Sequence, residues 1–145
     1  MLFRSAGVCA GVLVAPVIPF LNDDQIEAVL QAAYEHGARD AGYVVLRLPY
    51  EVKDLFRDWL ERHYPLKARH VMSRVHAMRG GRDNDPNFGT RMSGEGEFAA
   101  LLSRRFAIAK RRIGFEERSR MLRSASLDTT LFRVPPALAG QMNLF

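Results

Sequence analysis

Two short apolar runs with one amphipathic helix between them constrain the fold of this chain most strongly. Gly11–Ile18 and Gly42–Leu48 are rich in β-branched residues and apolar at successive positions, which is typical of parallel strands buried on both faces. Between them, the apolar residues of Ile26–Tyr34 recur at the spacing of one helical face, and Gly37 is placed to end the helix. This order predicts a βαβ unit with a right-handed crossover.

The start of that helix carries residues suited to capping. Asn22 is a favoured N-cap residue, and Gln25, three residues later, is placed to reach back and complete a capping box. Asp23 and Asp24 would then lie in the first turn, where negative charge is stabilised by the helix dipole.

The remaining chain predicts helices around one long loop. Amphipathic helices are expected over about 51–64, 65–78 and 97–113, and the glycine-rich stretch 80–96 is expected to form a loop. Two parallel strands need covers on their faces and edges to be stable. We therefore expect part of an α/β domain, with the end of a larger sheet in residues 1–50, a helical region in 51–114 and a basic, proline-bearing tail in 115–145.

Cysteine and hydropathy content limit the location and metal chemistry of the chain. Its 145 residues include one cysteine, Cys9, which excludes an internal disulfide and predicts a reducing, cytoplasmic environment. The apolar stretch Val8–Phe20 is too short to span a membrane and is interrupted by Pro16 and Pro19. The four histidines lack suitably spaced cysteines or paired carboxylates, so no metal site is predicted.

Positive charge is concentrated in the second part of the sequence. After residue 60, Lys and Arg outnumber Asp and Glu by sixteen to eight, and most of the basic residues are arginines. Such a region is typical of a surface that binds DNA or RNA. Solvated helix faces in an arginine-rich protein would give the same composition, and the sequence leaves both interpretations open.

One segment resembles a motif of a known enzyme superfamily. Residues Ala15–Asp23 resemble the fifth-strand region of the radical S-adenosylmethionine (radical SAM) barrel, where a G-x-I-x-G-x-x-E pattern lies beside the adenine of the cofactor. Ile18 and Asp23 match or nearly match this pattern. Pro16 and Phe20 occupy its glycine positions, and a large side chain at Phe20 would hinder close approach of the cofactor.

Four further segments extend this resemblance over most of the chain. Gly42–Pro49 resembles the sixth barrel strand, and Leu48–Phe56, Met78–Asp83 and Phe88–Met92 are similar to DNA-repair-photolyase-like radical SAM proteins, a group related to spore photoproduct lyase. The resemblance implies the last βα units of a partial TIM-like (β/α)6 barrel, followed by a helical C-terminal region and an extended tail.

The resemblance also implies cofactors and an activity. Intact members use S-adenosylmethionine and a [4Fe–4S] cluster for lyase-like radical chemistry, which suggests a role in DNA repair or nucleic-acid modification. The cluster is held by a CxxxCxxC loop that this sequence lacks. We therefore expect a C-terminal fragment that is inactive alone. The alternative is a non-catalytic adaptor that binds nucleic acid or the bacterial sliding clamp.

Three residues near the predicted strand ends are candidates for cofactor binding. Ligands of parallel α/β folds lie at the carboxyl ends of strands, where Ile18, Arg47 and Leu48 are predicted to lie. Arg47 interrupts an apolar run, as expected for a side chain facing SAM or substrate. Its structural alternative is an ion pair with a helix carboxylate such as Asp54.

The glycine-rich loop carries three arginines that could contact nucleic acid or substrate. Arg79, Arg82 and Arg91 lie among glycines that would let backbone amides approach a phosphate. Internal salt bridges to Asp83 and Asp85 would explain these arginines equally well.

The last residues of the sequence resemble a partner-binding peptide. Gln141, Leu144 and Phe145 match the Q-L-S/D-L-F peptide with which bacterial repair and replication proteins bind the sliding clamp. An amide followed by two large apolar side chains suits an apolar pocket on a partner. The alternative is an apolar tail that packs on its own domain.

Overall fold

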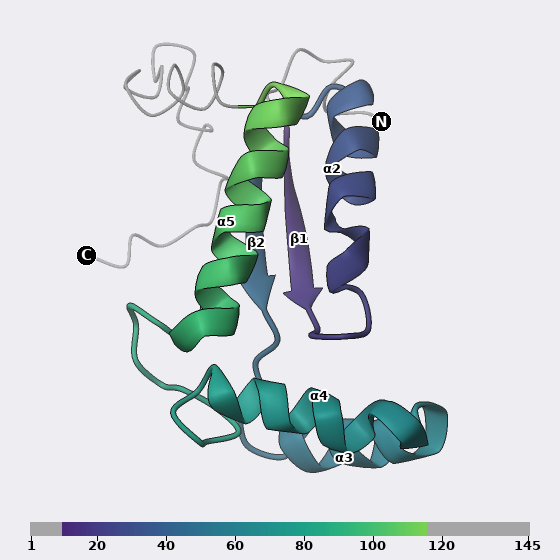
Figure 1. The fold of residues 1–145 in the computed structure, drawn as a ribbon, viewed down its shortest axis with the longest axis vertical. Helices are drawn as coiled ribbons and strands as arrows, with labels where there is room; N and C mark the ends of the chain where they lie inside the picture. Colours follow the sequence, from purple (N-terminus) through teal and green to yellow (C-terminus); the bar gives the residue numbers. More distant parts are fainter. Residues whose placement is uncertain (1–9, 116–145) are drawn as a thin grey trace, which may run out of the picture.

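The structure, a computed structural model, describes residues 10–115 as a mixed α/β fold (Figure 1). The elements, in chain order, are β1 (Gly11–Val17), a short 3-10 helix η1 (Asp23–Gln25), α2 (Ile26–Glu35), β2 (Asp40–Val45), α3 (Val52–His63), α4 (Pro65–Ala77) and α5 (Gly96–Ile113). The predicted strand–helix–strand unit and the three later helices are confirmed. Across residues 10–115, no helix combines the length and apolar character needed to cross a membrane.

The two strands pair in parallel, as the sequence predicts. Leu13 lies opposite Gly42, and the register shifts between Val14 and Val17. The second strand begins two residues earlier than predicted and ends three residues earlier, at Val45, whose amide donates to Met92 O in the long loop at 2.9 Å.

The capping box predicted at Asn22 is wrong. The Asn22 side chain makes no cap hydrogen bond to the helix. Its Oδ1 instead accepts from the amide of Ile18 at 2.7 Å, and its Nδ2 donates to Pro16 O at 3.0 Å. Asn22 thus closes the turn that leaves β1, and the chain enters α2 through η1. The predicted helix end is confirmed, because Gly37 has a φ of 86°.

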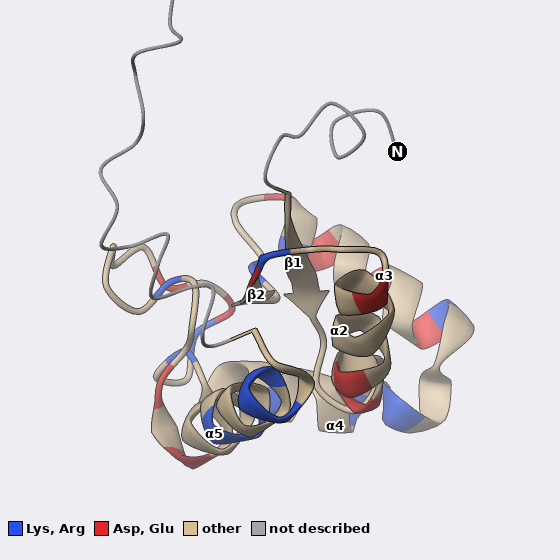
Figure 2. Cartoon of the chain, turned by 90° about the horizontal axis from the view of Figure 1, so that it is seen from above, with Lys and Arg blue, Asp and Glu red and all other residues tan. Residues whose placement is uncertain are grey.

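The main apolar cluster covers one face of the sheet. Helices α2 and α5 lie on the same side of the strands (Figures 1 and 2). The Phe106 ring of α5 packs at a tilt of 46° against Tyr43 of β2, with 4.7 Å between ring centroids. The buried members of this cluster are Val17, Ile26, Leu30, Ala38, Ala41, Val45, Met78, Ala99, Leu102, Phe106, Ala109 and Phe115.

A second cluster lies beyond the ends of the strands, under the α3–α4 pair. It consists of Leu46, Leu48, Leu60, Val71 and Val75. Both strands point toward this pair of helices, so the carboxyl ends of the strands and the long loop meet there (Figure 1).

The opposite face of the sheet has no cover among the described residues. Leu13 alternates with the covered Val12 and Val14 along β1, and its side chain is 62% exposed. The prediction that both faces are buried is therefore wrong for residues 10–115, which supply helices to one face only.

The long loop returns the chain to the sheet. It contains no helix or strand between residues 80 and 95, as predicted. Gly94, with a φ of 76°, packs against Met78, and the amide of Glu95 donates to Met78 O at 3.0 Å. Helix α5 then packs on α2 and ends at Gly114, whose φ of 102° confirms the predicted stop. The helical region therefore contributes α5 to the cover of the sheet.

Candidate functional site at the carboxyl ends of the strands

The residues that follow the two strands meet the long loop, and this junction holds most of the predicted site residues. Leu46 N donates to Val17 O at 2.9 Å, which keeps the two chain segments together beyond the sheet. The segment after β2 carries Arg47 and Leu48, and the segment after β1 carries Ile18.

Two of the three predicted cofactor contacts are packed into the second apolar cluster. Leu48 is 1% exposed, and Ile18 is partly buried against the same cluster. In the described structure their side chains support the α3–α4 pair. Their role in cofactor binding stays a prediction.

The Phe20 side chain packs against residues of α4 and α5. Its ring centroid lies 4.2 Å from that of His70 and 5.9 Å from that of Phe98, and Arg74 lies against the same ring at 5.7 Å. The backbone of Phe20 has a φ of 62°. The turn therefore directs this side chain toward α4 and α5, which hold the ring.

Arg79 joins the loop to the strand end. It is 3% exposed, and its guanidinium donates to Leu46 O at 2.9 Å, to Val45 O at 3.4 Å and to Thr90 O at 3.2 Å. The sequence predicted that this residue contacts nucleic acid or substrate. The structure instead places it inside the junction, where it presents almost no surface to a partner.

The electrostatic environment of Arg79 is unfavourable to its charge. Burial lowers the pKa of Arg79, the carboxylate of Asp85 opposes this, and the charge of Arg47 lowers it further. Arg47 and Arg79 are therefore close enough to repel one another. The alternative that Arg47 pairs with Asp54 is wrong, because Asp54 pairs with Arg57 at 3.6 Å.

Asp85 organises the loop around this junction. It is 7% exposed, and its carboxylate accepts hydrogen bonds from the Thr90 hydroxyl and from the amide of Asn87. The Thr90 bond is the main reason that the pKa of Asp85 lies below its usual range, with the Asn87 bond and the charges of Arg79 and Arg82 adding to it. Asp85 thus bonds to loop residues and forms no direct salt bridge with an arginine in the described chain.

The other two loop arginines differ in their surroundings. Arg82 is exposed. Arg91 is half-buried, and its guanidinium lies 4.5 Å from the centroid of the Phe88 ring. The predicted internal salt bridges to Asp83 and Asp85 are absent for both residues within the described range.

Asp83 anchors the start of the loop to both helices of the α3–α4 pair. Its Oδ1 accepts from Arg57 of α3 at 2.7 Å and lies 2.8 Å from His76 Nε2 of α4. The hydrogen bond to His76 is the largest cause that lowers the pKa of Asp83, followed in the same direction by the charge of Arg57. Sequence spacing did not reveal this contact, because Arg57 lies 26 residues from Asp83.

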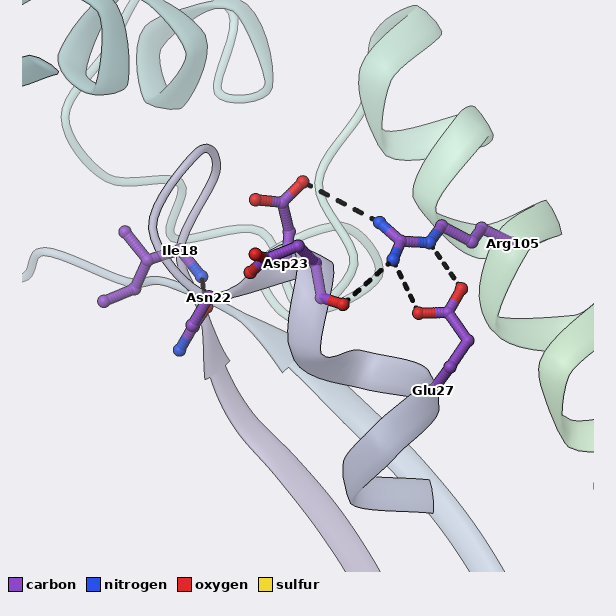
Figure 3. A network of polar contacts seen from close by, with 6 residues as sticks. Ile18, Asn22, Asp23, Glu27 and Arg105 are labelled. Atoms are coloured by element: carbon purple, nitrogen blue, oxygen red, sulfur yellow. Dashed lines mark hydrogen bonds and ion pairs between the residues drawn. The ribbon is translucent and has the colours of Figure 1, made fainter. Parts of the chain in front are cut away.

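A polar network at the other end of the turn connects η1 and α2 to α5 (Figure 3). Arg105 donates to both carboxylate oxygens of Glu27, at 2.6 and 2.5 Å, and to Asp24 O at 3.4 Å. Asp23, the acidic residue of the barrel-like motif, lies 4.0 Å from the same guanidinium. In the described structure Asp23 therefore serves the contact between helices.

The described residues contain no group of three or more His, Cys, Asp or Glu side chains that could hold a metal ion. Cys9 and the predicted clamp-binding residues Gln141, Leu144 and Phe145 lie outside the described residues. Comparisons with protein-family models, with curated proteins and with solved structures found no match.

Proposed function

We propose that this chain is the C-terminal portion of a radical SAM protein of the DNA-repair-photolyase-like group, acting on nucleic acid. The observation that carries the proposal is the half-covered sheet. In a barrel, helices cover the outer face of the strands, while the inner face meets side chains of the other strands. The exposed Leu13 and the open strand edges of the described residues are suited to pairing with such strands.

The order of motifs supports the same proposal. The segments that resemble the fifth and sixth barrel strands, Ala15–Asp23 and Gly42–Pro49, begin in β1 and β2 and continue past the carboxyl ends of these strands, and α2 connects the two strands. The helical region then follows, and its α5 lies where an outer helix of such a barrel would lie, on the face already covered by α2 (Figure 2).

The residues of this chain do not suit a [4Fe–4S] cluster, which takes cysteine ligands. The chain has a single cysteine, and its described residues hold no cluster of metal-binding side chains. We therefore assign the cluster to another part of the protein and derive no reaction step through it. The contribution of this chain is to bind and orient, with Arg47 and Ile18 at the strand ends nearest to SAM or substrate.

The test is to extend the reading frame upstream of Met1. We expect the DNA to encode a CxxxCxxC segment in frame, and the longer protein to bind iron and sulfide and to cleave SAM when reduced. The 145-residue chain, purified in the same way, should be colourless. An upstream sequence without this motif, or a longer protein that binds neither iron nor SAM, would overturn the proposal.

A second candidate is a non-catalytic adaptor, favoured by the basic end of α5. This helix carries Arg111 and Arg112 at exposed positions in its last turn, whereas the neighbouring Lys110 pairs with Asp40 at 2.7 Å. An adaptor of this kind should bind DNA or RNA with an affinity that falls steeply as salt is added. It should also bind the sliding clamp through Gln141, Leu144 and Phe145, and the triple alanine variant should lose that binding without losing thermal stability.

A further inference from the structure

At the junction between β2 and the long loop, the described arginines outnumber the carboxylates that could compensate their charge. Three arginines lie on the chain segments that meet there, namely Arg47, Arg79 and Arg91. Among the described residues, Asp85 is the carboxylate that influences Arg79, and its oxygens already accept from Thr90 and Asn87. Burying like charges together is unfavourable unless an opposite charge compensates them.

Each of these arginines also has an unused hydrogen-bond donor. The Nε atoms of Arg47, Arg79 and Arg91 are buried and have no hydrogen-bond partner within residues 10–115. The side chain of Arg79 is 3% exposed. Its hydrogen bonds within the described residues go to neutral carbonyl oxygens. Buried donors without partners are rare in native structures, and each calls for an explanation, of which a bound water or ion is one.

Backbone contacts bring together the chain segments that carry the three residues. The guanidinium of Arg79 bonds to the carbonyls of Leu46 and Thr90, which directly precede Arg47 and Arg91. The amide of Val45 also donates to Met92 O at 2.9 Å, so the two segments run beside each other. This junction lies just beyond the carboxyl end of β2, the usual position of ligands in parallel α/β folds.

We propose that Arg47, Arg79 and Arg91 form an anion site for a phosphate group at the carboxyl end of β2. Guanidinium groups match the geometry of phosphate oxygens and retain their charge when partly buried. Arg47 and Arg91, which are half-buried, contact the phosphate. Arg79 is a positioning residue that holds the two segments together and adds to the positive potential.

The inference of an anion site depends on the three arginines alone. The inference that the bound phosphate belongs to a substrate such as a nucleic-acid strand depends on the proposed function. The test described here uses neither iron nor SAM. Its failure is therefore distinguishable from failure of the cluster and SAM experiments on the longer protein.

The experiment measures the binding of inorganic phosphate to the full chain and to its Arg47→Gln and Arg91→Gln variants. Arg104→Gln, at an exposed position on α5, is the matched control. Phosphate should raise the unfolding midpoint of the parent and of R104Q more than chloride does at equal ionic strength. In R47Q and R91Q its affinity should fall about tenfold or more, since each loses a charge-assisted bidentate contact.

A second arm identifies the source of the phosphate. A single-stranded oligonucleotide that binds more tightly than inorganic phosphate, and loses that advantage in R47Q and R91Q, assigns the site to nucleic acid. Equal binding assigns it to a small phosphate-bearing molecule. Should R47Q fail to fold, R91Q carries the comparison. The proposal is overturned if neither ligand depends on Arg47 or Arg91, or if phosphate stabilises the parent no more than chloride.

Discussion

The two faces of the sheet differ sharply although the same strands form both. On one face, Val12, Val14 and Tyr43 pack under α2 and α5, which belong to parts of the chain far apart in sequence. On the other face, Leu13 remains mostly exposed. Both faces are apolar in sequence, so the difference lies in which cover this chain supplies.

Under the proposed function, this difference assigns the stability of the described residues and the contact with the rest of a barrel to opposite sides of the same sheet. The covered face provides the apolar burial that holds the described residues together. The open face adds little to that stability, and under the proposed function it is the surface that meets the rest of a barrel. Substitutions on the two faces should therefore behave differently, and the following changes test that separation.

The largest loss of stability is expected from Phe106→Ala. Phe106 is 6% exposed, and its ring lies against Tyr43 in the middle of the cover. Truncation removes the burial of the ring and leaves a cavity between α5 and β2, so the free energy of unfolding should fall by about 3–4 kcal/mol. Urea denaturation followed by circular dichroism measures this loss. Ile108→Ala, at a position that is 64% exposed on the same helix, is the control and should change stability little.

A smaller loss is expected when Arg79 is replaced by Met, because Arg79 secures the loop that leads to α5. Arg79→Met keeps much of the apolar stem but leaves the carbonyls of Leu46 and Thr90 without this donor. Removal of the repulsion between Arg79 and Arg47 offsets part of the loss, so we expect a net decrease of about 2 kcal/mol. Limited proteolysis should show faster cleavage within residues 80–95. Unchanged cleavage and unchanged stability would contradict the anchoring role.

Local signals in the sequence predicted the elements but not the contacts that join them. Helix ends at Gly37 and Gly114 depend on the glycine itself, and both were predicted correctly. The role of Asn22 was predicted wrongly, because its side-chain amide can bond either to the first amides of the helix or to the backbone of the preceding turn. In the structure it bonds to the backbone of Ile18 and Pro16, and local sequence rules do not describe the geometry of that turn.

The sequence predicted the arginines of the candidate site but not that their chain segments come together. Sequence reasoning selected Arg47 for the strand end and Arg79 and Arg91 for the loop, but it treated them as two separate sites. Their meeting depends on the loop folding back so that Arg79 reaches Leu46, 33 residues away. The pairing of Arg105 with Glu27, 78 residues apart, was missed for the same reason. Single-sequence patterns carry no information about such distant partners.

A modest, pH-dependent loss is expected from Glu27→Gln, which weakens the tie between the two covering helices. The hydrogen bonds from Arg105 are the main reason that the pKa of Glu27 is lowered. A lowered folded-state pKa means that the stabilisation is present above the ordinary value of about 4.5 and is lost as the pH falls through the folded value. Because both side chains are partly exposed, the loss at pH 7 should be about 0.5–1 kcal/mol.

This effect is measured by thermal unfolding of the parent and of E27Q between about pH 3 and pH 7, a range that includes the ordinary carboxylate pKa values. The two curves should converge at acid pH, since protonated Glu27 no longer accepts the charge-assisted bonds. Ala28→Ser, at an exposed position of the same helix, is the control. A difference that is independent of pH would show that the residue acts through packing instead of charge.

The smallest effect on this chain is expected from Leu13→Asp, and it tests the open face directly. Leu13 is 62% exposed, so a carboxylate at this position remains in water, and the free energy of unfolding should change by about 0.5 kcal/mol or less. Val14→Asp, at the next position on the covered face, should destabilise the chain clearly more than L13D, because its charge would be partly buried against the apolar cluster. In the upstream-extended protein, L13D should become as damaging as V14D, since the additional strands would bury residue 13. If L13D already unfolds the 145-residue chain, or if it remains harmless in the extended protein, the open face is not the inner surface of a larger sheet.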